Sequence, residues 1–193
     1  MISNIEKKFL FLVVLGGKTT KANVELHDVR WVIGSKIEDT FDVLRSEWFG
    51  SLEGLHIDSY KKIQHVDGHK INLRKTEIKK KNDFLPRKIF KKNLWFVNIG
   101  GYHPSSMQEQ HEFGLVVASS STEAKNIAKS KWLCGFLKKH KDDISSLKKL
   151  ITLDDCELIK RIGTWEIELT KENNLFEEDN SPDWFGYKRI DKI

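Results

Sequence analysis

Two short patterns of histidine and carboxylate residues occur twice in this 193-residue chain. Glu25 is followed two positions later by His27, and Glu109 is followed in the same way by His111. In an extended backbone, residues i and i+2 point to the same side, so each pair can hold one ligand or work as an acid and a base. These four residues, Glu25, His27, Glu109 and His111, are the candidates for catalysis.

A second pattern, His-x-Asp, follows each Glu-x-His pattern along the chain. If both patterns meet in space, two imidazoles and two or three carboxylates would converge, which is enough for a zinc, manganese or iron site. The sequence has no HExxH motif and no pair of CxxC motifs, so structural hydrogen bonds or ligand recognition compete with the metal interpretation. The prediction is no cofactor, with a divalent metal as the alternative. The candidate metal ligands are His27, His56, Asp58, His111, His140 and Asp142.

The segments that carry these patterns are related by a constant spacing. The run from Lys8 to Gly17 returns as Lys92 to Gly101, which is an offset of 84 residues (92 − 8). The same offset aligns Trp48 with Trp132 without a gap. The opening run resembles a secretory signal, but its return in mid-chain favours a buried strand that is too short to span a bilayer. We therefore expect a tandem duplication.

Each copy needs strands and one helix to position its polar pairs. Apolar runs and period-two alternation predict strands, Ser-x-x-Glu boxes predict helix starts, and Asp67-Gly68 predicts a two-residue hairpin turn. An offset of 96 between Ile71 and Ile167 (167 − 71) implies an insertion of about 12 residues, predicted to be a short helix at Asp154–Gly163 in place of the Asp-Gly turn. The predicted strands are Phe9–Leu15, His27–Gly34, Tyr60–Val66, His69–Leu73, Leu94–Ile99, Phe113–Ala118, Ser146–Ile151 and Thr164–Leu169, and the helices run from the box Ser35/Glu38 to Trp48 and from about Thr122, after the box Ser120/Glu123, to Leu137.

These elements predict an α+β fold, a tandem duplication of a ββαββ unit. We expect mixed or antiparallel sheets, helices packed on one face, and an internal pseudo-two-fold. The predicted segments are a first repeat at 1–76, a basic connector at 77–92, a second repeat at 93–172, and an acidic and aromatic tail at 173–193, together in one compact domain.

Composition restricts the compartment and the partners. The net charge is +5, from 33 basic and 28 acidic residues, and the basic excess is concentrated in the connector. Basic residues interleaved with aromatic ones can bind nucleic acid, but no RNA-binding motif accompanies them, so we expect no nucleic-acid partner. Cys134 and Cys156 are expected to be reduced thiols in a cytoplasmic protein. No membrane partner is expected, and a protein partner, a small ligand or a homodimer stays open.

Several motifs resemble a known family. They are Glu-Leu-His-Asp-Val at Glu25–Val29, Trp-Phe-Gly at Trp48–Gly50, His-Ile-Asp at His56–Asp58, and the strand with double glycine at Val97–Tyr102. These motifs resemble bacterial proteins of domain-of-unknown-function family 1543, which carry one or two copies of the domain. The resemblance covers about 9–73 and 94–169 and implies no activity.

The leading functional hypothesis is a small cytoplasmic binding or interaction protein with two related recognition loops, and not an enzyme. The first alternative is a metal-dependent, hydrolase-like enzyme that uses the Glu-x-His and His-x-Asp pairs. The second alternative is nucleic-acid binding through the basic connector.

Overall fold

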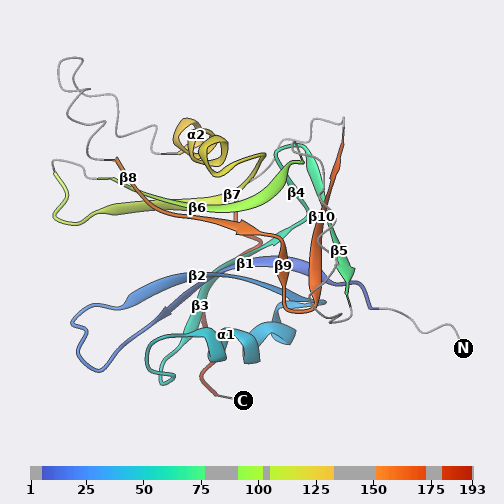
Figure 1. Ribbon diagram of the computed structural model, residues 1–193. Coiled ribbons are helices and arrows are strands. Elements are labelled where there is room, and N and C mark those ends of the chain that lie inside the picture. The colour runs from blue at the N-terminus through green and yellow to red at the C-terminus, as the bar shows by residue number, and fades with distance from the viewer. Residues whose placement is uncertain (1–5, 77–90, 102–104, 133–150, 173–179, 193) are drawn as a thin grey trace, which may run out of the picture. The chain divides into compact units, whose positions relative to one another are not determined.

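The computed structural model describes residues 6–76, 91–101, 105–132, 151–172 and 180–192. This part of the chain forms antiparallel sheets with two short α-helices, which confirms the α+β class (Figure 1). The elements are β1 (Phe9–Gly17), β2 (Leu26–Gly34), the 3-10 helix η1 (Ile37–Thr40), α1 (Phe41–Glu47), β3 (His56–Ile63), β4 (His65–Val66), β5 (His69–Lys75), β6 (Asn93–Gly101), β7 (Gln110–Ala118), α2 (Ser121–Lys131), β8 (Ile151–Ile159), β9 (Arg161–Ile162), β10 (Trp165–Lys171) and β11 (Trp184–Arg189).

The strands are arranged in three sheets, with the orders β11-β3-β1-β2, β7-β6-β8 and β4-β5-β10-β9. The chain divides into two compact units, one made of Met1–Thr76 with Ile162–Ile193 and the other of Glu77–Arg161. The C-terminal strand β11 therefore belongs to the same unit as β1.

The predicted opening strand is confirmed as β1, and it lies between β2 and β3. Its apolar run is continuous because a central strand is buried on both faces. Leu10 is 1% exposed on one face, and Val13 and Leu15 are fully buried on the other. Strand β6 has the same central place in the second sheet.

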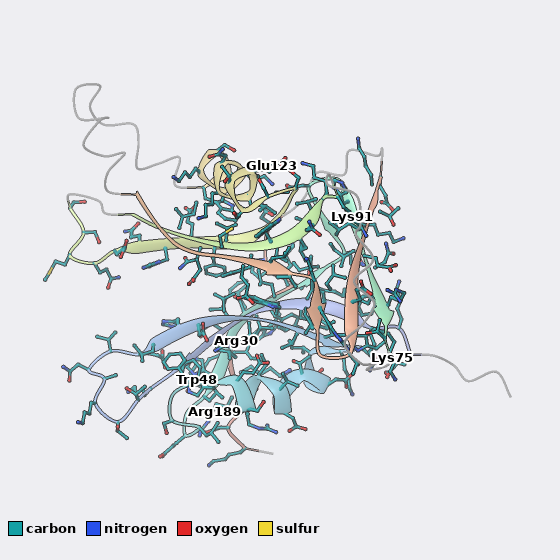
Figure 2. All side chains as sticks on the ribbon, viewed as in Figure 1. Arg30, Trp48, Lys75, Lys91, Glu123 and Arg189 are labelled. Atoms are coloured by element: carbon teal, nitrogen blue, oxygen red, sulfur yellow. The ribbon has the colours of Figure 1, made fainter. Side chains whose placement is uncertain are left out.

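The helical segment after β2 covers one face of the first sheet (Figure 1). Leu44 of α1 and Trp48, which follows α1 directly (Figure 2), pack into the core with Val13 and Leu15. The predicted capping box is shifted by one residue. The Asp39 carboxylate accepts the Ser35 N–H at 2.9 Å, whereas Glu38 pairs with Lys188. The Asp39 position is favoured because the segment opens as a 3-10 turn, which tightens the first turn.

Helix α2 covers one face of the second sheet, with Ala124 and Ala128 fully buried against Val97. Its predicted start is confirmed, because the Ser120 hydroxyl accepts the Glu123 N–H at 3.2 Å. Glu123, at the first turn (Figure 2), accepts the backbone N–H of Ser119 at 2.8 Å. The helix ends at Lys131, and the rest of the predicted span lies outside the described residues.

The predicted hairpin at Asp67-Gly68 is confirmed. Both residues have positive φ, 50° and 69°, as a type I′ turn requires. The helix predicted at Asp154–Gly163 is wrong, because β8 continues to Ile159 and β9 follows it. Pairing of β8 along β6 overrides the helical spacing of its apolar residues, and Gly163, at φ 55°, stands in a second hairpin turn.

The pairing registers locate the change of offset. Gly16 and Gly100 face His27 and His111, which keeps the offset of 84. Gly16 faces His56 on the other side, whereas Gly100 faces Thr152, and the offset there is 96 (152 − 56). The spacing between facing positions is therefore 84 residues for β2 and β7 and 96 residues for β3 and β8.

Several predictions lie outside the described residues. They concern most of the basic connector, the strand start at 146–150, Cys134, His140 and Asp142. Neither described helix has the length and apolar composition needed to span a membrane.

Candidate functional site

Gly16, near the end of β1, lies between two histidines. It pairs with His27 of β2 on one side and with His56 of β3 on the other. A Cβ at Gly16 would lie 2.4 Å from His56 Nε2 and 3.0 Å from Asp58 Oδ2. The absence of a side chain at this position therefore makes room for the two histidines and the carboxylate beside them.

Asp58 reaches this place through an irregularity of β3. Ser59 pairs with Val14 and Ile57 with Leu15, which leaves Asp58 without a partner on β1. An extra residue of this kind bends the strand and changes the direction of a side chain. His56 and Asp58 can thus converge near Gly16.

Four side chains, Glu25, His27, His56 and Asp58, form the first cluster. The Asp58 carboxylate lies between the two imidazoles: Oδ1 is 3.1 Å from His56 Nε2 and Oδ2 is 3.2 Å from His27 Nε2. Glu25 lies slightly farther away, with oxygens 3.7 Å from His56 Nε2 and 4.0 Å from His27 Nε2. The Nε2 atoms of both histidines therefore face both carboxylates.

The two histidines differ in burial and in restraint. His27 is 55% exposed, whereas His56 is 1% exposed. The Gly54 carbonyl oxygen lies 2.8 Å from His56 Nδ1, and the Tyr187 ring packs against the His56 ring with centroids 4.0 Å apart. A carbonyl oxygen only accepts hydrogen bonds, so Nδ1 carries a proton and donates it to Gly54. The other ring nitrogen, Nε2, faces the carboxylates.

The charges of the first cluster are not balanced by lysine or arginine. Among the described residues, the ion pairs of Glu25 and Asp58 are with His27 and His56 alone. The neighbouring Asp28 pairs with Arg30, and Lys188 on β11 pairs with Glu38. Two carboxylates without a lysine or arginine partner among the described residues favour a negative potential, which attracts a cation.

In the described ranges, no group of three or more His, Cys, Asp or Glu side chains is arranged to hold a metal ion. The first cluster is held by histidine–carboxylate distances of 3.1–4.0 Å. Its catalytic candidates are also placed: Glu25 and His27 lie 4.0 Å apart, and Asp58 is the closer acid to His27.

The second Glu-x-His pair stands in a different environment. His111 Nε2 lies 3.8 Å from Glu109 Oε2, and His111 faces Gly100 as His27 faces Gly16. The position that corresponds to His56 is Thr152, which faces Gly100 from the other side. The expected partners His140 and Asp142 lie outside the described residues.

The sequence did not predict that Tyr187 and Asp191 lie beside the first cluster. Both belong to the C-terminal segment, which was predicted to be an acidic and aromatic tail. Arg189 and the Gly54 N–H hold the pKa of Asp191 far below its usual range. The aromatic residues Trp184, Phe185 and Tyr187 favour a strand, but nothing in the sequence indicates that this strand pairs with β3.

The fold and the site define an α+β protein of antiparallel sheets with a histidine–carboxylate cluster beside a central glycine. A family model described as Domain of Unknown Function (DUF1543) matches residues 22–73 and 106–169. The chain belongs to this family.

One solved structure is similar over nearly the whole chain. The crystal structure of a protein Il1583 from Idiomarina loihiensis has 32% sequence identity and a TM-score of 0.68, and the match covers 95% of this chain and 98% of that chain. No curated protein matches the chain. Neither description names an activity, so a function has to be argued from the first cluster.

Proposed function

We propose that the protein is a binding protein whose first cluster recognises a small cationic group. One observation carries the proposal: the carboxylates of Glu25 and Asp58 lie within 4.0 Å of the Nε2 atoms of His27 and His56, and among the described residues these two acids form no ion pair with a lysine or an arginine. A donor that carries positive charge can satisfy both carboxylates.

The geometry favours an ammonium or guanidinium group as the cation. Such groups offer several N–H donors, and two separate carboxylates lie near His56 Nε2, with an Asp58 oxygen 3.1 Å and a Glu25 oxygen 3.7 Å from it. A divalent metal ion is the second source of the same charge. A histidine that binds a metal commonly donates its other ring N–H to a backbone carbonyl, as His56 does to Gly54.

We further propose that the chain is a tandem duplication. Equal registers of β1 with β2 and of β6 with β7 support the duplication. In the sheet β4-β5-β10-β9, Asn72 of β5 pairs with Glu168 of β10. Glu168 is also the residue that corresponds to Asn72 at an offset of 96 (168 − 72). This pairing supports a local two-fold relation of β5 and β10.

A cytoplasmic location is part of the proposal, and the free thiol of Cys156 supports it. Burial raises the pKa of this thiol, so Cys156 fits an unreactive structural residue better than a nucleophile.

The experiment is a titration of the full chain, labelled with ¹⁵N-histidine, with two classes of cation. Arginine and spermidine are the organic probes, and Zn²⁺ and Mn²⁺ are the metal probes. We expect one class to shift the His27 and His56 ring resonances in a saturable manner. Affinity is expected to fall about tenfold or more in Asp58→Asn, because a hydrogen bond to a charged group contributes about 1.5–3 kcal/mol.

The matched control is Glu109→Gln, which removes the corresponding carboxylate of the second pair and should leave the affinity unchanged. Isothermal titration calorimetry gives the affinities of all variants. The class of probe that binds identifies the source of the charge. Wild-type resonances that none of the probes shifts, or an Asp58→Asn variant that binds within twofold of wild type, would contradict the proposal.

A further inference from the structure

We infer that Asp191 is a positioning residue for His56, and that the C-terminal segment completes the first cluster. Asp191 acts through Gly54. Its Oδ2 accepts the Gly54 N–H at 2.9 Å, and the Gly54 carbonyl accepts the His56 Nδ1–H at 2.8 Å. Two consecutive hydrogen bonds thus connect a carboxylate at the end of the chain with the ring that faces the ligand.

Gly54 needs this restraint because little else holds it. Its φ is +79°, in the left-handed region, and no atom lies within 4 Å of the position that a Cβ would take. A glycine in open space has the widest choice of backbone conformations. The peptide group between Gly54 and Leu55 is held by the Leu55 N–H, which donates to the Leu52 carbonyl at 3.1 Å. The peptide group between Glu53 and Gly54 is held by Asp191, which accepts the Gly54 N–H. The direction of the Gly54 carbonyl depends on these two hydrogen bonds.

Asp191 is itself held firmly in place. The neighbouring Ile190 is fully buried, and its N–H donates to the Leu55 carbonyl at 2.9 Å. The Ile190 carbonyl accepts a hydrogen bond from Arg45 Nη1 at 3.0 Å. The side chain of Asp191 is 3% exposed and paired with Arg189, which lies opposite His56 in the β11–β3 ladder. The buried Ile190 and the ionised carboxylate of Asp191 therefore both contact the segment Gly54–Leu55.

The predicted consequence concerns the tautomer of His56. With Gly54 fixed, its carbonyl selects the ring form that carries the proton on Nδ1 and the lone pair on Nε2. Without Asp191, Gly54 can turn its carbonyl away. The Nδ1–H tautomer of His56 then loses its hydrogen-bond acceptor, and the population of the Nε2–H tautomer rises. The effect on cation affinity rests on the proposed function, whereas the effect on the tautomer does not.

The test uses the full chain with ¹⁵N-labelled histidine, at alkaline pH and without any added cation. Two readouts are taken for His56: the ring nitrogen shifts, which report the tautomer, and the exchange rate of the Nδ1 proton with solvent. Asp191→Ala is compared with wild type and with Glu38→Ala. The control also removes a carboxylate that pairs with β11, through Lys188, but Glu38 does not touch Gly54.

We expect wild type and Glu38→Ala to show the Nδ1–H form and slow exchange. Asp191→Ala should show a mixture of both tautomers and faster exchange. In a parallel titration, its cation affinity should fall about tenfold, since partners that orient a ligand histidine typically contribute at least that much. If Asp191→Ala kept the wild-type tautomer and exchange rate, the inference would be wrong.

Asp191→Asn covers the case in which Asp191→Ala does not fold. The asparagine keeps an oxygen acceptor for Gly54 and loses the charge that pairs with Arg189. This variant should keep the Nδ1–H tautomer with exchange at least severalfold faster than in wild type. Unchanged exchange in this variant would refute the positioning role. If Asp191→Ala changes the tautomer as expected but wild type binds no cation, the proposed function is refuted and the positioning role of Asp191 stands.

Discussion

Replacing Gly16 by alanine tests the assembly of the first cluster most directly. The added methyl group would lie 2.4 Å from His56 Nε2, whereas ordinary contact begins at about 3.4 Å. The ring would have to retreat by about 1 Å (3.4 − 2.4). His56 is 1% exposed and covered by Tyr187, so there is little space for such a movement.

The cost follows from two contributions. Overpacking a buried site typically costs about 1–3 kcal/mol. A retreat of the ring also strains or breaks the 2.8 Å hydrogen bond from Nδ1 to Gly54, which adds about 1 kcal/mol. We therefore expect Gly16→Ala to lower the free energy of unfolding by about 2–4 kcal/mol.

Urea denaturation measures this loss, and the His56 ring resonances show whether the cluster is still assembled. Gly17→Ala is the matched control, because its Cβ would lie 2.8 Å from Trp48 Cζ2, on the core side of the same strand. It should destabilise by about 1–3 kcal/mol with the His56 resonances unchanged. The reasoning is refuted if Gly16→Ala costs less than about 0.5 kcal/mol, or if both variants disturb His56 equally.

Three further predictions concern other parts of the fold. Ser120→Ala removes the cap of α2 and should cost about 1 kcal/mol, measured by urea denaturation; a loss confined to other segments in hydrogen exchange would contradict it. Hydrogen bonds from Lys92 and Ser119 lower the pKa of Glu123 from 4.5 to about 2. The stabilising contribution of Glu123 is therefore present above pH 4.5 and disappears as the pH falls towards about 2. The difference in Tm between wild type and Glu123→Gln should vanish over that interval, and a constant difference would contradict this prediction. Gly68→Ala places a side chain at φ +69° and should cost about 1 kcal/mol in the same denaturation assay, with no cost if the turn is not type I′.

Local signals in the sequence predicted much of the fold. The strand β1 could be recognised because burial on both faces leaves a continuous apolar run. The Asp67-Gly68 turn could be recognised because few residue pairs tolerate two positive φ values. Ser120 was recognisable as a cap because its hydroxyl is the acceptor that the helix start needs. Each of these features depends on residues that are neighbours in sequence.

Features that depend on distant pairing could not be predicted. Leu158, Ile159 and Ile162 have the spacing of a helical face, yet pairing with β6 makes Leu158 and Ile159 part of a strand. A constant offset pairs His56 with His140 and Asp58 with Asp142, which lie outside the described residues, whereas the residue of β8 that faces Gly100 is Thr152. The register of β8 on β6, and not the order of residues, decides which side chains are equivalent.

The candidate site shows how the two kinds of information combine. The sequence identified His27 and His56 as candidate site residues, because histidines and acids at i and i+2 share one side of a strand. Their convergence, however, follows from Gly16, a residue that the sequence interpreted only as the end of a strand. In the second sheet, Gly100 faces His111 on one side and Thr152 on the other. The pairing registers therefore place histidines on both sides of Gly16, and a histidine and a threonine on the two sides of Gly100.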